Sequence, residues 1–176
     1  MNIKKTANLL INFTIKRLAE ILGIIVFSFG FLLLVSLLTY SPEDPNFIFP
    51  ENTQIINLLG FQGSYVSDLF FQAIGLISYL ISITFIITGI NIIRIKEFFL
   101  IIENIFFSIL YCIFGTLFLN HFYSNSFTLF INGNSGFVGS FINQSFLGSL
   151  VQSNQILFYY VLIFIILFLF LISINF

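Results

Sequence analysis

The chain has 176 residues, and its composition is apolar and almost uncharged. Hydrophobic residues make up 59% of it, charged residues make up 7%, and the mean hydropathy is +1.08. A chain this short cannot bury so many apolar side chains in a water-soluble core, so lipid must be the solvent for most of it. Six basic residues and a net charge of −1 argue against a nucleic-acid surface, which needs clustered Lys and Arg facing water. We therefore expect an integral membrane protein that does not bind nucleic acid directly.

Four segments are long and apolar enough to cross a bilayer, which takes roughly 20 apolar residues. Their backbones must be helical, because unpaired amides in lipid cost several kcal/mol each. The predicted fold is an all-α integral membrane domain over residues 18–176, preceded by a basic tail over residues 1–17. The expected spans cover about residues 21–40, 66–93, 98–119 and 155–174, with long loops over residues 41–65 and 120–154.

The basic residues indicate how the spans are oriented. Every Lys and Arg falls either in the N-terminal tail or in the short link between the second and third spans, namely at Lys4, Lys5, Lys16, Arg17, Arg94 and Lys96. Basic segments next to spans stay on the cytoplasmic side, so both chain ends are predicted to be cytoplasmic and both long loops to lie outside. The first apolar stretch exceeds the length of a cleaved signal sequence, and we expect it to remain as an anchor.

The long loop before the last span contains an amphipathic pattern over residues 137–152. Its apolar residues recur at helical spacing, and its Ser, Asn and Gln residues fall largely elsewhere on the helical wheel. The apolar set is Val138, Phe141, Ile142, Phe146 and Leu150. This pattern predicts a helix that lies flat on the outer leaflet, held there by its apolar side.

Two features of the second span can be predicted from its small and polar residues. Ser64 is expected to cap the helix, and Asp68 in the first turn would then lie near the positive pole of the helix dipole. Small side chains allow close helix contact in lipid. Those of Gly75, Ser78, Ser82 and Gly89 predict the face of this span that packs against another helix.

Constellations typical of enzymes are missing from the sequence. There is one histidine, His121, and one cysteine, Cys112, so a two-histidine zinc motif cannot be built from this chain alone. The sequence contains neither the Gly-x-x-x-x-Gly-Lys of a nucleotide-binding loop nor the Gly-x-Ser-x-Gly of a hydrolase. We predict no catalytic, cofactor-binding or metal-binding residues.

Apart from Asp68 at the outer edge of the second span, Glu103 is the only charged residue inside a predicted span, and a carboxylate in a membrane is a candidate functional residue. It lies about five residues from the cytoplasmic end, or ~7 Å along the helix. It can reach the interface or pair with Lys96 or Arg17, and we favour this structural role. A contact between helices of a bundle or oligomer, and conduction of protons or ions, are the alternatives.

The loop between the first two spans carries a recognisable order of residues. Glu20-Ile21-Leu22-Gly23 opens the first span, Tyr40-Ser41-Pro42-Glu43-Asp44-Pro45 follows it, and Asn57-Leu58-Leu59-Gly60-x-x-Gly63-x-x-x-x-Asp68 leads into the second. This order resembles the N-terminal four-span region of the FtsK/SpoIIIE family of bacterial DNA translocases. The residues of the loop that carry the resemblance are Pro42, Asp44, Pro45, Asn57, Gly60, Gly63 and Asp68.

The resemblance implies a protein of the bacterial inner membrane that acts in cell division and chromosome segregation at the septum. It also implies a homo-oligomer and contacts with other cell-division proteins. Family members continue into a linker and an ATP-driven motor, which this sequence lacks, so we expect either a fragment or a homologue without a motor, and no enzyme activity. The family loop is predicted to be a structural connector or a contact surface.

Two other classes of function fit the composition. One is a small transporter or channel subunit that uses Glu103 and the polar residues of the second span. The other is a membrane subunit of an envelope enzyme complex whose active site lies on a partner.

Overall fold

The structure is a computed structural model that describes residues 3–45, 54–124 and 132–175, and its regular structure is entirely helical. Four segments are long and apolar enough to cross a membrane: Asn8–Leu38, Gly60–Ile95, Phe99–Tyr123 and Gln155–Ser173. The predicted all-α, multi-pass membrane protein is therefore confirmed. In chain order the elements are α1 (Ile3–Leu38), α2 (Gly60–Ile74), the 3₁₀ turn η1 (Gly75–Ile77), α3 (Ser78–Ile95), α4 (Phe99–Tyr123), α5 (Gly136–Asn143), α6 (Phe146–Ser153) and α7 (Gln155–Ser173).

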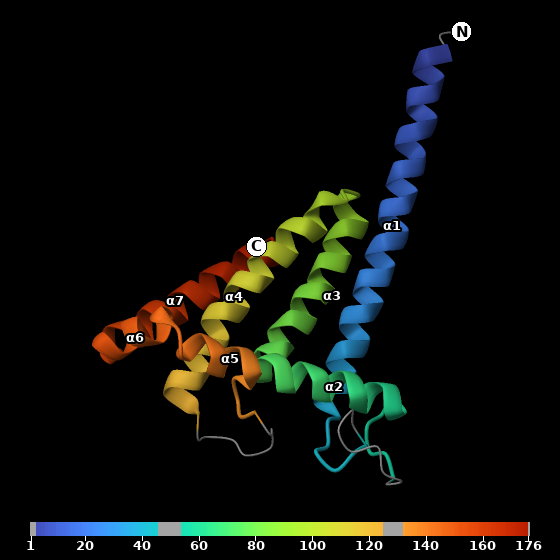
Figure 1. Ribbon diagram of the computed structural model, residues 1–176. Helices are drawn as coiled ribbons and strands as arrows, with labels where there is room; N and C mark the ends of the chain where they lie inside the picture. The colour runs from blue at the N-terminus through green and yellow to red at the C-terminus, as the bar shows by residue number, and fades with distance from the viewer. Residues whose placement is uncertain (1–2, 46–53, 125–131, 176) are drawn as a thin grey trace.

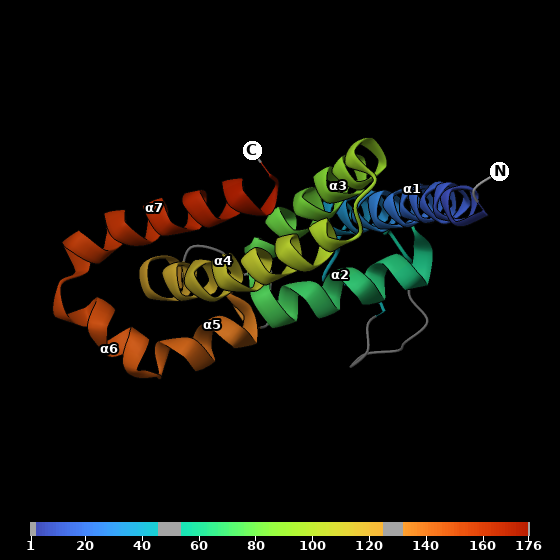
Figure 2. The ribbon, with the colours of Figure 1, turned by 90° about the horizontal axis from the view of Figure 1, so that it is seen from above.

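The long helices pack as two pairs, α1 with α3 and α4 with α7 (Figures 1 and 2). Glycines let the first pair approach closely. A Cβ atom on Gly23 would lie 2.9 Å from the carbonyl oxygen of Gly89, and one on Gly30 would lie 2.7 Å from the backbone nitrogen of Ile86. Backbone atoms cannot move aside easily, so small residues are required where these two helices cross. The predicted packing residues Gly75, Ser78, Ser82 and Gly89 are all buried.

Arg17 of the tail and Lys96 of the link meet at one end of the bundle, which we call the basic end. Glu20 on α1 accepts from Arg17 through one carboxylate oxygen and from Lys96 through the other, each at 2.6 Å. Helix α1 already begins at Ile3, so the described part of the predicted basic tail continues the first span as one helix. Figure 1 shows this helix extending beyond the others.

The second apolar segment is not one straight helix, contrary to the predicted span over residues 66–93. It breaks at Gly75, so that α2 runs across the ends of α1 and α3 while α3 runs alongside α1 (Figure 1). Gly75 has φ +59°, and a Cβ atom there would overlap the carbonyl group of Asn134, whose oxygen accepts from the backbone N–H of Leu76 at 2.9 Å. The 18 residues of α3 cover about 27 Å, close to the thickness of the hydrocarbon core.

The predicted helix cap at Ser64 and first-turn position of Asp68 are both wrong. Helix α2 begins four residues earlier, at Gly60, and has no side-chain cap. Ser64 lies within the helix, where its hydroxyl donates to the carbonyl oxygen of Pro45 at 2.7 Å. Asp68 lies in the middle of α2 and is buried. The end of the molecule that contains α2 and residues 39–45 is called the loop end below.

The amphipathic segment forms two short helices, α5 and α6, where one was predicted over residues 137–152. Ser145 separates them, and its hydroxyl accepts from the backbone N–H of Leu147 at 3.3 Å as the cap of α6. The apolar residues divide between two sides: Ile142 and Leu147 pack against the buried cluster of α4, α6 and α7, whereas Phe141 and Phe146 are exposed.

Candidate functional site

The buried carboxylate of Asp44 joins the two sides of the family loop. Its oxygens accept from the backbone N–H groups of Ile56 at 2.8 Å and Asn57 at 2.9 Å, and its side chain is only 3% exposed. Pro42 lies exposed in the turn closed by the bond from the Asp44 N–H to the Ser41 carbonyl. Charge-assisted bonds of this kind are among the stronger hydrogen bonds in proteins. Asp44 therefore holds the residues after α1 against the residues before α2.

Asn57 connects the loop to the end of α1. Its side-chain amide donates to the carbonyl oxygens of Ser36 at 2.9 Å and Thr39 at 3.3 Å, and its side-chain oxygen accepts from the backbone N–H of Leu59 at 3.1 Å. Carbonyl groups in the last turn of a helix have no partner within the helix. Asn57 thus supplies the hydrogen bonds that α1 lacks at its end, and it also shapes the turn that starts α2.

The two glycines of the family motif have different roles. Gly60 has φ +66°, a conformation that most side chains disfavour, although a Cβ atom there would meet nothing within 4 Å. Gly63 lies against Asn57, and a Cβ atom there would overlap the Asn57 side-chain oxygen and lie 2.6 Å from the Cβ of Leu59. The Gly63 carbonyl accepts from the Ser36 hydroxyl at 2.6 Å. Gly60 therefore permits a turn, and Gly63 permits close packing.

Asp68 is separate from this network and makes weaker contacts. One carboxylate oxygen accepts from the Tyr40 hydroxyl at 3.3 Å and from the Gln72 amide at 3.4 Å. Burial, and then the negative charge of Asp68, raise the pKa of Tyr40 to about 12. Asp68 also lines a groove of 370 Å³ between α2 and the start of α5.

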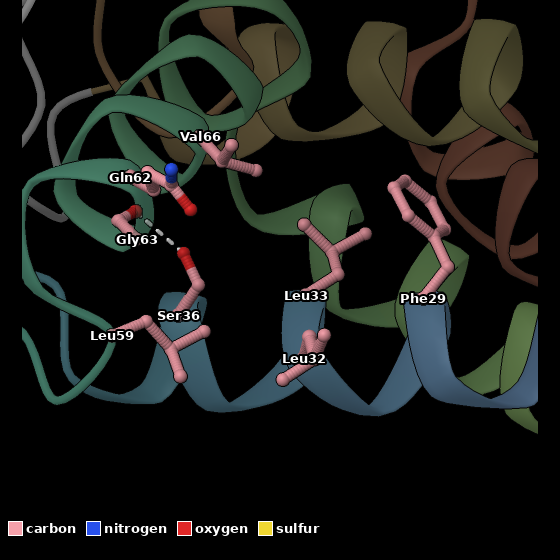
Figure 3. Close-up of a pocket in the computed structure, with 8 residues that line it drawn as sticks. All are labelled: Phe29, Leu32, Leu33, Ser36, Leu59, Gln62, Gly63 and Val66. Atoms are coloured by element: carbon pink, nitrogen blue, oxygen red, sulfur yellow. Dashed lines mark hydrogen bonds between the residues drawn. The ribbon is translucent and has the colours of Figure 1, made fainter.

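A second hollow, of 290 Å³, lies in the corner between α1 and α2 (Figure 3). Figure 3 shows the hydroxyl of Ser36 directed at the Gly63 carbonyl, so the most buried polar group of the wall is already bonded. Most of the side chains that line this hollow are apolar, so it suits an acyl chain or an apolar side chain and offers no group for catalysis. Its lining residues are Phe29, Leu32, Leu33, Ser36, Leu59, Gln62, Gly63 and Val66.

Glu103 lies on the surface of α4, and it forms no ion pair with any residue in the described ranges. Its predicted partners Arg17 and Lys96 are bound to Glu20 instead. The neighbouring residue, Asn104, is 1% exposed, and its amide donates to the Thr88 hydroxyl on α3 at 2.8 Å. Glu103 was predicted as a candidate residue because of its charge. Asn104 was not predicted, because its only distinguishing feature in the sequence is a polar amide inside an apolar run.

The side chains described above connect helices to one another and to the loop. Among residues 3–45, 54–124 and 132–175, no three His, Cys, Asp or Glu side chains come together as metal ligands. His121 contacts Asn143 at 3.3 Å and thereby links α4 to α5. The seven family-motif residues lie together at the loop end, five of them buried: Asp44, Pro45, Asn57, Gly63 and Asp68.

Comparisons with known proteins agree with this arrangement. The model of the family described as the 4TM region of DNA translocase FtsK/SpoIIIE matches residues 15–175. The DNA translocase FtsK of Rickettsia prowazekii (strain Madrid E) is 31% identical over 72 residues, which are 41% of this chain and 10% of that protein. The match thus spans about a tenth of the relative's length, and no solved structure matches the chain significantly. Because the family match covers most of the first spanning segment, the other three completely and the loop end, the chain belongs to the family of the four-transmembrane region of the FtsK/SpoIIIE DNA translocases.

Proposed function

We propose that this chain is the membrane anchor of an FtsK-like DNA translocase and acts in cell division and chromosome segregation at the septum. The observation that carries the proposal is the family match over residues 15–175, which includes most of the first spanning segment and all of the other three. The anchor itself performs no ATP-driven step, because its described part consists of packed apolar helices and hydrogen-bonded connections. Pumping of DNA would belong to a motor, on the same polypeptide or on another.

The proposed topology places the basic end in the cytoplasm and the loop end outside the bacterial inner membrane. The clustering of Arg17, Arg94 and Lys96 at one end supports it, since basic residues next to spans are retained on the cytoplasmic side. With this orientation α2 would lie at the outer surface of the membrane. Helices α5 and α6 would lie beside it, with exposed Phe141 and Phe146 in the outer leaflet.

The proposed partners are further copies of the chain and other cell-division proteins. The hydrogen bonds of the loop end support the second part of this proposal, because a surface that is already held in place loses little entropy when a partner binds. Exposed Glu103 gives no support to a transporter, since its side chain lies on the outside of the helix pair.

The test is the position of a fluorescent fusion in dividing cells. An anchor of the division machinery gathers at mid-cell during constriction, and a uniform membrane distribution would refute the proposal. Topology is tested separately with single cysteines on a Cys112→Ser background, placed at the exposed positions Glu43 and Glu97. A membrane-impermeant thiol reagent should label the cysteine at position 43 in intact cells, and the one at position 97 only after permeabilisation.

A further inference from the structure

The groove between α2 and α5 contains a buried carboxylate that has only neutral partners. Asp68 is 4% exposed, and both of its hydrogen-bond donors, the Tyr40 hydroxyl and the Gln72 amide, bind the same oxygen. A buried charge is costly unless an opposite charge lies beside it. Asp44 differs in this respect, because backbone N–H groups occupy both of its oxygens. Asp68 is therefore a buried carboxylate at the loop end whose negative charge is balanced neither by a cation nor by hydrogen bonds to both of its oxygens.

No cationic side chain of this chain can supply that compensation. All six Lys and Arg residues belong to the tail or to the link, and residues 39–93 and 97–176 contain none. Arg94 follows Ser78 by 16 residues on α3, which places it about 24 Å along the helix from the loop end. The remaining titratable base, His121, contacts Asn143 on α5. An opposite charge for Asp68 would therefore have to come from another molecule.

A second hydrogen-bond acceptor in the same groove indicates what kind of cation that molecule would carry. The side-chain oxygen of Gln72 is buried and has no hydrogen-bond partner among the described residues, and Gln72 lies one helical turn from Asp68 on the same face of α2. Exposed Leu69 and Phe137 flank the groove. A divalent cation such as Ca²⁺ requires six to eight oxygen ligands, whereas a guanidinium presents several N–H donors in one plane and stacks on aromatic rings.

We propose that this groove binds an arginine side chain of a partner protein, with apolar residues beside the arginine covering Leu69 and Phe137. The guanidinium donates to the Asp68 carboxylate and to the side-chain oxygen of Gln72. This inference rests on the proposed function and deepens it, because it specifies the chemistry of the contact at the loop end. The partner segment lies on the same side of the membrane as α2.

The chain offers a direct measurement, because it contains only two aspartates, Asp44 and Asp68. The full chain in lipid nanodiscs, labelled with ¹³C at the aspartate carboxyl carbons, gives two signals, which the Asp68→Asn variant assigns. The probe is the peptide acetyl-Leu-Arg-Leu-amide. Matched peptides carry citrulline, which has the same shape without the charge, or lysine. Glu43→Gln is the control variant, since Glu43 is an exposed carboxylate at the same end.

The arginine peptide should shift the Asp68 signal and leave the Asp44 signal in place. The citrulline peptide should bind the wild type at least about tenfold more weakly than the arginine peptide does, since hydrogen bonds between charged groups are stronger than neutral ones. The arginine peptide should bind the Asp68→Asn variant at least about tenfold more weakly than it binds the wild type, for the same reason. Glu43→Gln should bind as the wild type does. Equal binding of citrulline, an unmoved Asp68 signal, or undiminished binding by Asp68→Asn would overturn the inference, and equal binding of lysine would overturn its assignment to arginine. A failed titration together with a fusion that gathers at mid-cell would overturn this inference alone and leave the proposed function intact.

Discussion

Replacing Asn57 with alanine should destabilise the protein more than any other single truncation of an amide at the loop end. The change removes two donors to the carbonyls of Ser36 and Thr39 and one acceptor for the Leu59 N–H. At about 0.5–1.5 kcal/mol for each net hydrogen bond, the three contribute about 1.5–4.5 kcal/mol. Two of them are longer than 3 Å, so we expect a loss of about 2–3 kcal/mol in the free energy of unfolding.

Two further variants separate hydrogen bonding from side-chain volume. Asn57→Asp keeps the shape but replaces the donating amide with an oxygen that faces two carbonyl oxygens, so it should destabilise at least as much as Asn57→Ala. Gln62→Ala removes an exposed amide from α2 and should change the free energy by less than about 0.5 kcal/mol. The assay is reversible unfolding in mixed micelles. If Asn57→Ala were as stable as Gln62→Ala, the assignment of Asn57 as the link between α1 and α2 would be refuted.

The remaining predictions concern the glycines, the tyrosine and the charge on α4. Gly63→Ala should displace Asn57 and cost about 2 kcal/mol or more, whereas Gly60→Ala, with open space around it, should cost only the backbone strain of about 1 kcal/mol; equal losses would contradict the packing role of Gly63. Gly89→Val should separate α1 from α3 and cost about 3 kcal/mol in the same unfolding assay, whereas Ile90→Val on the exposed side should cost little. Because the pKa of Tyr40 is raised to about 12, its stabilising contribution is complete below pH 10 and is lost as the pH rises through 12; ultraviolet titration of Tyr40→Phe should lack one tyrosine that ionises near pH 12 in the wild type. Glu103→Gln should leave stability within about 0.5 kcal/mol of the wild type, and a large loss would reveal a contact that the exposed side chain does not show.

Hydropathy was sufficient to predict the spans, because their length and composition depend only on local sequence. It could not predict the break at Gly75. The apolar run continues through that position, and the helix changes direction there because Gly75 adopts φ +59°. Its missing Cβ atom leaves room for the Asn134 carbonyl, 59 residues further along the chain. The same limit applies to Ser64, whose partner is the carbonyl of Pro45 rather than the start of its own helix. Such contacts depend on tertiary structure, and a single sequence does not encode them locally.

The two aspartates of the loop end allow structure and recognition to be separated in one experiment. Asp44→Asn should cost about 1.5–3 kcal/mol, because one of its two backbone N–H donors would then face an amide instead of a carboxylate oxygen. Asp68→Asn removes a buried charge that has no counter-charge in the chain, so it should leave stability unchanged or raise it. A stable Asp68→Asn protein that no longer binds the arginine peptide would mean that the chain retains a destabilising carboxylate for the sake of a partner. A loss of stability equal to that of Asp44→Asn would instead make Asp68 a structural residue and contradict the inferred arginine site.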